Sequence, residues 1–329
     1  MGDVLRTTPL LPALKKKFRN CRITWLVDPQ CAGVLEHNPQ IDRLVTFSRK
    51  NLPILSKRRF DLAVNLDKEK EALDAIAAVR AAKKMGFGRS AAGELCALDG
   101  LSDYATRLGI DDELKFRINQ KSYQEISFEQ LGLRFKKEEY QFTVNREEVQ
   151  WAKRTLQKTG AKNNHGPLIG LNTGSGNRFA GKKLPIETVA ELAQKLTEQL
   201  NATVLLLGGK DEIKRNKKIM RLAPRWAFNA GSHPIRRFAA IVRHCDLVVT
   251  GDTIAMHIAI AAKVPVVAFF ASTCAAEIEL YGRGKKIVSE ISCAPCYKKI
   301  CPIDEQCMKD MKVETLVEAA REVLAEKFK

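Results

Sequence analysis

The chain has 329 residues. Two domains are expected at this length, because a single hydrophobic core rarely serves so many residues. Hydrophobic residues make up 45% and charged residues 28%, and no apolar run approaches the roughly 20 residues of a membrane-spanning helix. The net charge is +17, and the first 59 residues alone carry 12 basic and 4 acidic side chains. Such a surface favours anionic partners: nucleic acid, an anionic membrane or a phosphorylated substrate.

The sequence narrows the class of anionic partner and also indicates the cellular compartment. Nucleic acid is disfavoured because none of the usual nucleic-acid-binding motifs is present and only 7% of the residues are aromatic. Prolines and lysines interrupt the first residues, so we find no apolar segment typical of a signal peptide. Nine cysteines without such a signal indicate a reducing cytoplasm.

The first half of the chain alternates between predicted strands and helices. Thr8 is predicted to cap a helix with Pro9 at its first position. Strands are predicted at 23–27, 44–47 and 60–66, with a helix at 69–83, and this alternation favours a parallel sheet of the Rossmann type. A charged helical region is predicted to follow, up to about residue 155. An open sheet normally has a central strand before its first turn, whereas this sequence begins at the turn itself, so we expect that the sequence starts late.

The second half repeats the alternation more clearly. A polar segment with glycine and proline at 161–167 is the predicted domain boundary. Strands are predicted at 168–172, 203–207, 247–250 and 264–270. Helices are predicted at 185–200, 211–222, 235–243, after residue 253, and at 313–327. We therefore predict two Rossmann-like domains, 1–160 and 161–329, facing a central cleft.

The segment 246–270 is the most informative stretch, because it reads as a strand, a turn, a helix and a second strand. Gly251 ends the first strand, and Asp252 or Thr253 can cap the following helix, which carries His257 one turn later. The start of a helix presents free N–H groups and the positive end of its dipole, so it can bind phosphate. This turn is the predicted centre of the active site.

Three further groups of residues also follow predicted strands or turns. Asp3 lies on a glycine turn at the start of the chain. The loop Asn172–Asn177, with Thr173, Gly174 and Ser175, is followed by Lys182 and Lys183, and together they can cradle phosphate. Glu212 follows Gly208-Gly209, where an acid can accept hydrogen bonds from ribose hydroxyls. Each signal is weak alone, but open α/β sheets bind ligands at the carboxyl ends of their strands, where these residues converge.

Together these motifs resemble glycosyltransferase family 9, the ADP-heptose:lipopolysaccharide heptosyltransferases, of the heptosyltransferase II type. The resemblance rests on Gly-Asp-Val-x-x-Thr-Thr-Pro from Gly2, Lys-x-x-Pro from Lys182, Gly-Gly-x-x-Glu from Gly208, and Asp-Thr-x-x-x-His from Asp252. It covers nearly the whole chain, and the chain departs from the pattern where Ile254 replaces a glycine and Leu184 an aromatic residue. The family implies an α/β fold of the GT-B type, with an acceptor-binding first domain and a nucleotide-sugar-binding second domain.

The resemblance also implies a reaction and its residues. Heptose would move from ADP-heptose to the phosphorylated lipid A-core acceptor, by an inverting mechanism that requires no cofactor. Asp3 would be the general base and Lys182 would neutralise the donor phosphates. The other donor-binding residues would be Thr173, Gly174, Ser175, Glu212, Asp252, Thr253 and His257. The enzyme would work in the cytoplasm, in peripheral contact with the anionic inner membrane.

Four cysteines lie within 15 residues near the end of the chain: Cys293, Cys296, Cys301 and Cys307. The first two form a Cys-x-x-Cys pair, a common half of a zinc site, but the spacing of the second two is unusual for zinc. Reduced cysteines in a substrate-facing loop are the favoured interpretation. Two alternative functions remain open: a nucleotide-sugar epimerase of the same fold, which turns over donor without acceptor, and a metal-binding or redox protein built on this cluster.

Overall fold

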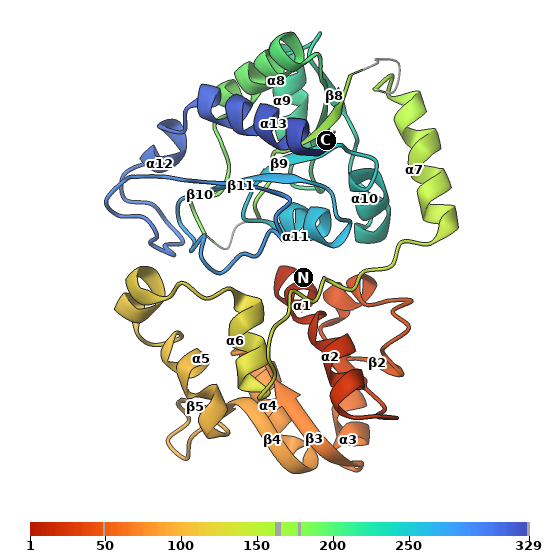
Figure 1. The fold of residues 1–329 in the computed structure, drawn as a ribbon, viewed down its shortest axis with the longest axis vertical. Coiled ribbons are helices and arrows are strands. Elements are labelled where there is room, and N and C mark those ends of the chain that lie inside the picture. The colour runs from red at the N-terminus through yellow and green to blue at the C-terminus, as the bar shows by residue number, and fades with distance from the viewer. Residues whose placement is uncertain (49, 162–165, 177–178, 328–329) are drawn as a thin grey trace. The chain divides into compact units, whose positions relative to one another are not determined.

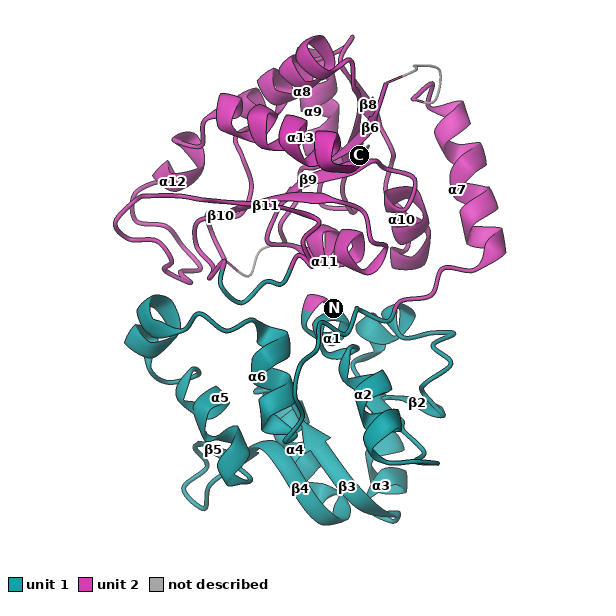
Figure 2. Cartoon of the chain, in the orientation of Figure 1, with its two compact units in different colours: residues 1, 3–141, 276–279 teal, residues 2, 142–275, 280–329 magenta. Residues whose placement is uncertain are grey.

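The computed structural model describes residues 1–48, 50–161, 166–176 and 179–327. They form two compact units (Figure 2). Unit 1 contains Met1, residues 3–141 and residues 276–279, and unit 2 contains Gly2 and residues 142–275 and 280–329. The main division thus falls at 141–142, whereas the sequence placed it at 160–161. The reason is that α7 (Arg146–Lys158) packs against α10 (Ile235–Val242) of unit 2. Residues 162–165 of the predicted linker lie outside the described residues.

Unit 2 is built on a six-stranded sheet in which all neighbouring strands are parallel. The strands are β6 (Leu168–Asn172), β7 (Thr203–Leu207), β8 (Ala227–Asn229), β9 (Leu247–Gly251), β10 (Val266–Phe270) and β11 (Gly284–Val288). Their spatial order is β8-β7-β6-β9-β10-β11, the doubly wound order of dinucleotide-binding folds. In such sheets ligands bind outside the carboxyl ends of the strands where the order reverses, here at β6 and β9.

Helices cover both faces of this sheet (Figure 1). One face packs against α8 (Ile186–Leu200), α9 (Ile213–Leu222) and α13 (Val313–Lys327), and the other against α10 and α11 (Ile254–Ala261). Every residue of β6, β7, β9 and β10 is buried. Double coverage explains why these strands are continuous apolar runs in the sequence rather than alternating ones. A short helix, α12 (Gln306–Lys309), precedes α13.

Unit 1 contains two small sheets among the described residues. In the first, β1 (Thr24–Val27) is parallel to β2 (Arg43–Thr46). In the second, β3 (Arg59–Asn65) is parallel to β4 (Arg80–Arg89), which is antiparallel to β5 (Leu95–Ala97). The helices are α1 (Gly2–Thr7), α2 (Leu10–Lys17), α3 (Asn51–Ser56), α4 (Lys70–Ala78), α5 (Asp103–Arg107) and α6 (Tyr123–Gln130), with short helical turns η1 (Pro29–Val34), η2 (Gly100–Ser102) and η3 (Leu114–Ile118).

Two sequence predictions for unit 1 are wrong. The helix predicted at 69–83 ends at Ala78, and β4 and β5 lie in the region predicted to be helical. The residues that open β4 are good helix formers, but pairing with β3 outweighs this local preference. Thr8 does not cap the following helix, because it is the C-cap residue of α1 and α2 begins only at Leu10, with Pro9 as its N-cap residue. The Thr8 hydroxyl instead donates to Leu5 O at 2.6 Å and accepts from Gln141 N–H at 2.9 Å.

Most elements of unit 2 are confirmed. The strands predicted at 168–172 and 203–207 and the helix at 313–327 have the predicted bounds, and the other predicted elements differ by one or two residues at their ends. β8, β11 and α12 were not predicted. Within the described part of the chain, no helix combines the length and the apolar character needed to cross a membrane.

Candidate active site

The turn after β9 leads into a capped helix, as the sequence predicts. Thr253 is the N-cap of α11, and its hydroxyl accepts the Ala255 N–H at 3.2 Å. The side-chain amide of Asn172, at the end of β6, lies 3.1 Å from the Thr253 hydroxyl and 3.2 Å from the Thr250 hydroxyl. It also donates to Gly174 O at 2.7 Å. These buried hydrogen bonds fix the carboxyl ends of β6 and β9 to each other, at the point where the strand order reverses.

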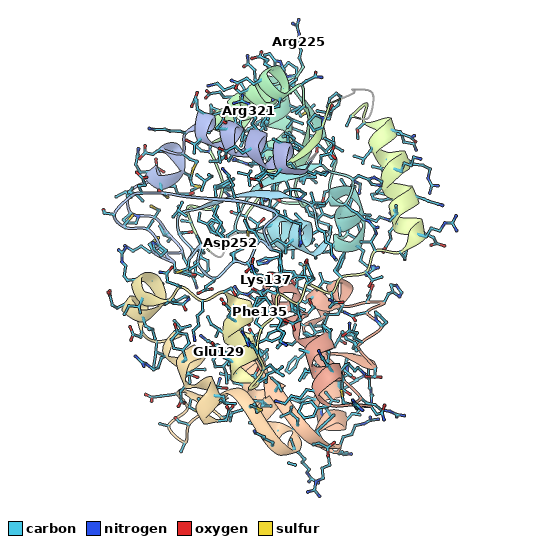
Figure 3. The ribbon with its side chains drawn as sticks, in the orientation of Figure 1. Glu129, Phe135, Lys137, Arg225, Asp252 and Arg321 are labelled. Carbon is cyan, nitrogen blue, oxygen red and sulfur yellow. The ribbon has the colours of Figure 1, made fainter. Side chains whose placement is uncertain are left out.

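Lys182 lies against this turn. Its ammonium is 3.2 Å from Asp252 Oδ2, and the two side chains are only 13% and 18% exposed. Asp252, labelled in Figure 3, precedes the N-cap residue Thr253 of α11 and also faces His257, whose Nε2 lies 3.8 Å from Asp252 Oδ1. A Cβ on Gly251 would lie 2.3 Å from Lys182 O, so the main chain of Lys182 crosses directly over this glycine. Three of the predicted residues are therefore brought together.

Glu212 lies between the loops that follow β6 and β7. Its carboxylate accepts the Gly209 N–H at 2.8 Å. A Cβ on Gly174 would lie 2.3 Å from Glu212 Cδ, and one on Gly208 would lie 2.7 Å from Glu212 Cβ. The Glu212 side chain therefore packs directly on the backbone of both glycines, and a Cβ at either position would displace it. The arrangement places the Glu212 carboxylate beside the predicted phosphate loop.

Thr173 and Ser175 play different parts in that loop. Thr173 is buried, and its hydroxyl lies 2.5 Å from Asn216 Oδ1 and 3.1 Å from Leu207 O. The side chain therefore holds the loop to β7 and α9 and is not directed at a ligand. Ser175 is only partly buried, and its hydroxyl donates to Gly176 O at 3.2 Å. Asn177, the last residue of the predicted loop, lies outside the described residues.

Residues that the sequence did not indicate support the segment before and after Lys182. The Glu305 carboxylate accepts the Gly181 N–H at 2.9 Å, and Lys298 O accepts the Ala180 N–H at 3.0 Å. The rings of Phe179 and Tyr297 pack edge to face at 5.2 Å. The loop that contains the four cysteines therefore braces the segment that carries Lys182.

Arg215 of α9 is a second cation near this segment. Its guanidinium donates to Leu184 O, two residues after Lys182. Burial lowers the pKa of Arg215, and the neighbouring carboxylates Glu212, Glu187 and Glu305 oppose that shift. A lone arginine on a basic helix gives no signal in a single sequence, and neither do Asn216 and Glu305. Their roles depend on contacts with distant segments.

The four cysteines differ in environment. Cys293 is exposed, Cys296 and Cys301 are partly buried, Cys307 is buried, and none of them forms a disulfide. Burial, followed by the neighbouring thiols, raises the pKa of Cys307 to about 11. Among the described residues, no group of three or more His, Cys, Asp or Glu side chains is placed to hold a metal ion.

Asp3 lies in unit 1, in the first turn of α1 rather than on a turn before the helix. Its carboxylate is 2.7 Å from Arg6 Nη2, and the Asp3 side chain is 60% exposed. Arg6 also stacks on the ring of Tyr123, with 3.7 Å to the ring centroid, and its Nη1 lies 3.5 Å from Glu277 Oε2. Burial alone would lower the pKa of Arg6, but Asp3, Tyr123 and Glu277 raise it above its ordinary value. Arg6 is therefore a permanent cation that holds the Asp3 carboxylate.

Lys68 is a further cation of unit 1. Its side chain reaches the surface, but its ammonium lies 3.4 Å from Ala105 O and 4.8 Å from the centroid of the Phe87 ring. Loss of hydration lowers the pKa of Lys68 to about 8, and the nearby charges of Lys115 and Arg6 add to the shift. Cations of this kind can bind an anionic group while they are protonated.

Comparison with known proteins identifies the family. The family model for glycosyltransferase family 9 (heptosyltransferase) matches residues 54–306. The chain belongs to this family. The lipooligosaccharide heptosyltransferase 2 of Campylobacter jejuni serotype O:2 is 32% identical over 93 residues, 27% of this chain. That match spans 29% of the relative, less than a third of its length.

Solved structures of other glycosyltransferases share the fold. The family 9 glycosyltransferase of Veillonella parvula has a TM-score of 0.75 at 20% identity, covering 99% of this chain and 94% of that one. The E. coli ADP-heptose lipopolysaccharide heptosyltransferase II has a TM-score of 0.70 at 17% identity, covering 100% and 97%. The iron-containing dodecameric glycosyltransferase TibC of enterotoxigenic E. coli is more distant, with a TM-score of 0.57 at 12% identity, covering 100% and 74%. The predicted α/β fold of the GT-B type is thus confirmed.

Proposed function

We propose that this protein is a heptosyltransferase that moves heptose from ADP-heptose onto the lipopolysaccharide inner core with inversion at the anomeric carbon. Membership of family 9 supports the reaction class. The observation that carries the proposal is the convergence of Lys182, Asp252, His257 and Glu212 at the carboxyl ends of β6, β7 and β9. A base on the acceptor and a site for the departing nucleoside diphosphate are the two requirements of such a transfer.

The donor would bind to unit 2. When the bond between heptose and ADP breaks, negative charge develops on the diphosphate, and the Lys182 ammonium and the start of α11 offer positive charge there. Asp252 repels phosphate, but it holds Lys182 in place at 3.2 Å and can accept hydrogen bonds from sugar hydroxyls. Glu212 would accept hydrogen bonds from the ribose. Thr253, His257 and the backbone of Gly174 and Ser175 would line the diphosphate.

The acceptor would bind to unit 1. Asp3 would take the proton of the acceptor hydroxyl as that oxygen attacks the anomeric carbon, and Arg6 would keep the Asp3 carboxylate in place. The cation Lys68 would attract an anionic group of the phosphorylated lipid A-core acceptor. The proton therefore moves to Asp3, while the electron pair of the broken bond leaves with ADP.

No cofactor is part of this proposal, because Lys182 and the helix terminus can neutralise the leaving group as a divalent metal does in other enzymes. If this is correct, chelator-treated protein keeps its transfer rate. Elemental analysis of the purified protein tests separately whether Cys293, Cys296, Cys301 and Cys307 hold zinc or iron. A lipid-linked acceptor further implies work in the cytoplasm, in peripheral contact with the inner membrane.

The experiment that tests the function measures donor binding and transfer in the full chain. Calorimetry with ADP, UDP and GDP is expected to show tightest binding of ADP, and the Lys182→Ala variant is expected to bind it more weakly. Incubation with ADP-heptose and an inner-core acceptor is expected to add one heptose to the acceptor. Turnover of donor without acceptor would instead favour an epimerase, and equal binding of all three nucleotides would contradict the donor assignment.

A further inference from the structure

A pocket of about 450 Å³ opens in unit 1 beside the first residues of β3 and β4. Its lining consists of Lys57, Arg59, Val79, Arg80, Ala81 and Lys84, four cations and two small apolar residues without any acid. Lys57 directly follows α3, and Val79 directly follows α4. The pocket thus combines residues from two helix ends and two strand starts, and its charged lining matches an anionic ligand.

Among the described residues, the cations of this pocket form no salt bridges. Arg59 and Arg80 are direct partners in the parallel pairing of β3 with β4, and like charges placed opposite each other destabilise a sheet. Neither arginine forms a salt bridge within 4.0 Å to any described residue. Asp61 is the one acid between residues 57 and 66, and it also lacks a salt bridge to the described residues. Lys84 donates a hydrogen bond to Ala77 O at 3.0 Å, so among the described residues it is the one cation of the four with a hydrogen-bond acceptor.

The pocket is far from the acceptor side of unit 1. The opposite end of β3, at Asn65, leads to Leu66, whose carbonyl accepts a hydrogen bond from the Tyr123 hydroxyl, and Tyr123 stacks on Arg6 beside Asp3. A strand of seven residues spans roughly 20 Å. Within unit 1, the starts of β3 and β4 accordingly lie at the end away from α1 (Figure 1). A ligand in this pocket therefore cannot be the reacting group.

An exposed apolar residue precedes the first of these cations in the sequence. Ile54 of α3 is 49% exposed, and it is followed three residues later by Lys57, Arg58 and Arg59. An exposed apolar residue beside several cations is the combination that binds the interface of an anionic membrane, where the cations meet phosphate and the apolar side chain enters the head-group region. A soluble phosphate would use the cations but would leave Ile54 without a role.

We propose that the pocket of Lys57, Arg59, Arg80 and Lys84 binds the phosphate of an anionic phospholipid head group and so docks unit 1 on a membrane surface. This inference rests on the proposed function only because a lipid-linked acceptor would require the enzyme to work at a membrane surface. It locates the contact at the starts of β3 and β4, away from the donor-binding residues of unit 2 and from Asp3. The binding itself requires neither donor nor acceptor.

The test is cosedimentation of the full chain with vesicles that contain no glycosyl acceptor. Vesicles of phosphatidylethanolamine with phosphatidylglycerol are compared with neutral phosphatidylcholine vesicles. Each basic residue near an anionic surface contributes about fivefold to binding, so the double variant Arg59→Gln/Arg80→Gln is expected to bind the anionic vesicles about 25-fold more weakly. The double variant Arg59→Lys/Arg80→Lys is expected to keep most of the binding, because it keeps the charge.

A matched control removes two exposed arginines from unit 2, Arg221 and Arg225, of which Arg225 is labelled in Figure 3. The Arg221→Gln/Arg225→Gln variant has the same net charge as the test variant and is expected to bind vesicles like the wild type. Equal weakening of vesicle binding in both double variants would show that net charge alone drives binding and would contradict the assignment of the binding site to the pocket. Calorimetry with glycerol phosphate distinguishes the other source, since tight binding of this soluble ligand without vesicle binding would overturn membrane docking.

Transfer assays separate this proposal from the function of the protein. With a water-soluble acceptor fragment, the Arg59→Gln/Arg80→Gln variant is expected to transfer heptose at the wild-type rate. With acceptor embedded in vesicles, its rate is expected to fall in parallel with its binding. Absence of any transfer by the wild type would contradict the heptosyltransferase proposal but would leave the vesicle-binding result intact.

Discussion

Adding a single carbon at Gly251 should change the position of Lys182 in the site without removing its charge. A Cβ there would lie 2.3 Å from Lys182 O and 3.0 Å from Phe269 Cε2. Ordinary contacts are about 3.5 Å, so the main chain of Lys182 would have to move by about 1 Å. A misplacement of that size can reduce a rate about 100-fold. We therefore expect the Gly251→Ala variant to lose about two orders of magnitude in kcat while Lys182 keeps its charge.

The assay is steady-state transfer from ADP-heptose, measured alongside thermal unfolding. Overpacking at this position should cost about 1–3 kcal/mol of stability, so the assay temperature must lie well below the melting temperature of the variant. Gly100 gives the matched control, because a Cβ there meets no atom within 4 Å and Gly100→Ala should leave the rate unchanged. A folded Gly251→Ala variant with wild-type kcat would refute the idea that the position of the Lys182 main chain over this glycine determines the rate of transfer.

Four further predictions follow from individual contacts. Lys182→Ala should lower kcat about 100- to 1000-fold in the transfer assay, because it removes one preorganised charge from the leaving group. Glu212→Gln should weaken ADP binding about tenfold by calorimetry, through loss of a charged acceptor for the ribose. The pKa of Lys68 is about 8, so this lysine is charged below pH 8 and neutral above it. The KM for the acceptor should therefore rise as the pH passes 8. The Lys68→Arg variant should not show this pH dependence, because arginine stays charged. Iodoacetamide at pH 8 should modify exposed Cys293 first and spare Cys307, whose pKa of about 11 keeps it protonated, as peptide mass spectrometry can show.

The sequence was most informative where local chemistry and tertiary structure agree. The strands of unit 2 are buried on both faces, so their apolar runs gave their positions directly. The turn at Asp252 and Thr253 carried its own capping signal, and Thr253 is the N-cap. Because parallel strands end at the same edge of a sheet, residues after different strands could be expected to meet, and Lys182 after β6 does meet Asp252 after β9, which also faces His257.

The sequence was least informative where partners are distant in the chain. β4 opens with helix-forming residues, and only its pairing with β3 makes it a strand. Glu305 supports Gly181 from 124 positions away, and the hydroxyl of Thr173 is bound by Asn216 rather than presented to a ligand. Arg6 offered no signal beyond its charge, although it joins Asp3, Tyr123 and Glu277. These contacts depend on how the chain folds back on itself, which no local pattern records.

The most direct test of the central claim is heptose transfer by the wild type and by the Asp3→Asn variant, with ADP binding measured on the same preparations. Asparagine keeps the shape of aspartate but cannot accept the proton of the acceptor hydroxyl. We expect the wild type to add one heptose to the inner-core acceptor, as detected by mass spectrometry. We expect the variant to bind ADP with unchanged affinity and to form no product. Transfer by the variant at the wild-type rate would contradict the role of Asp3, and a wild type that binds ADP but transfers no heptose would contradict the function itself.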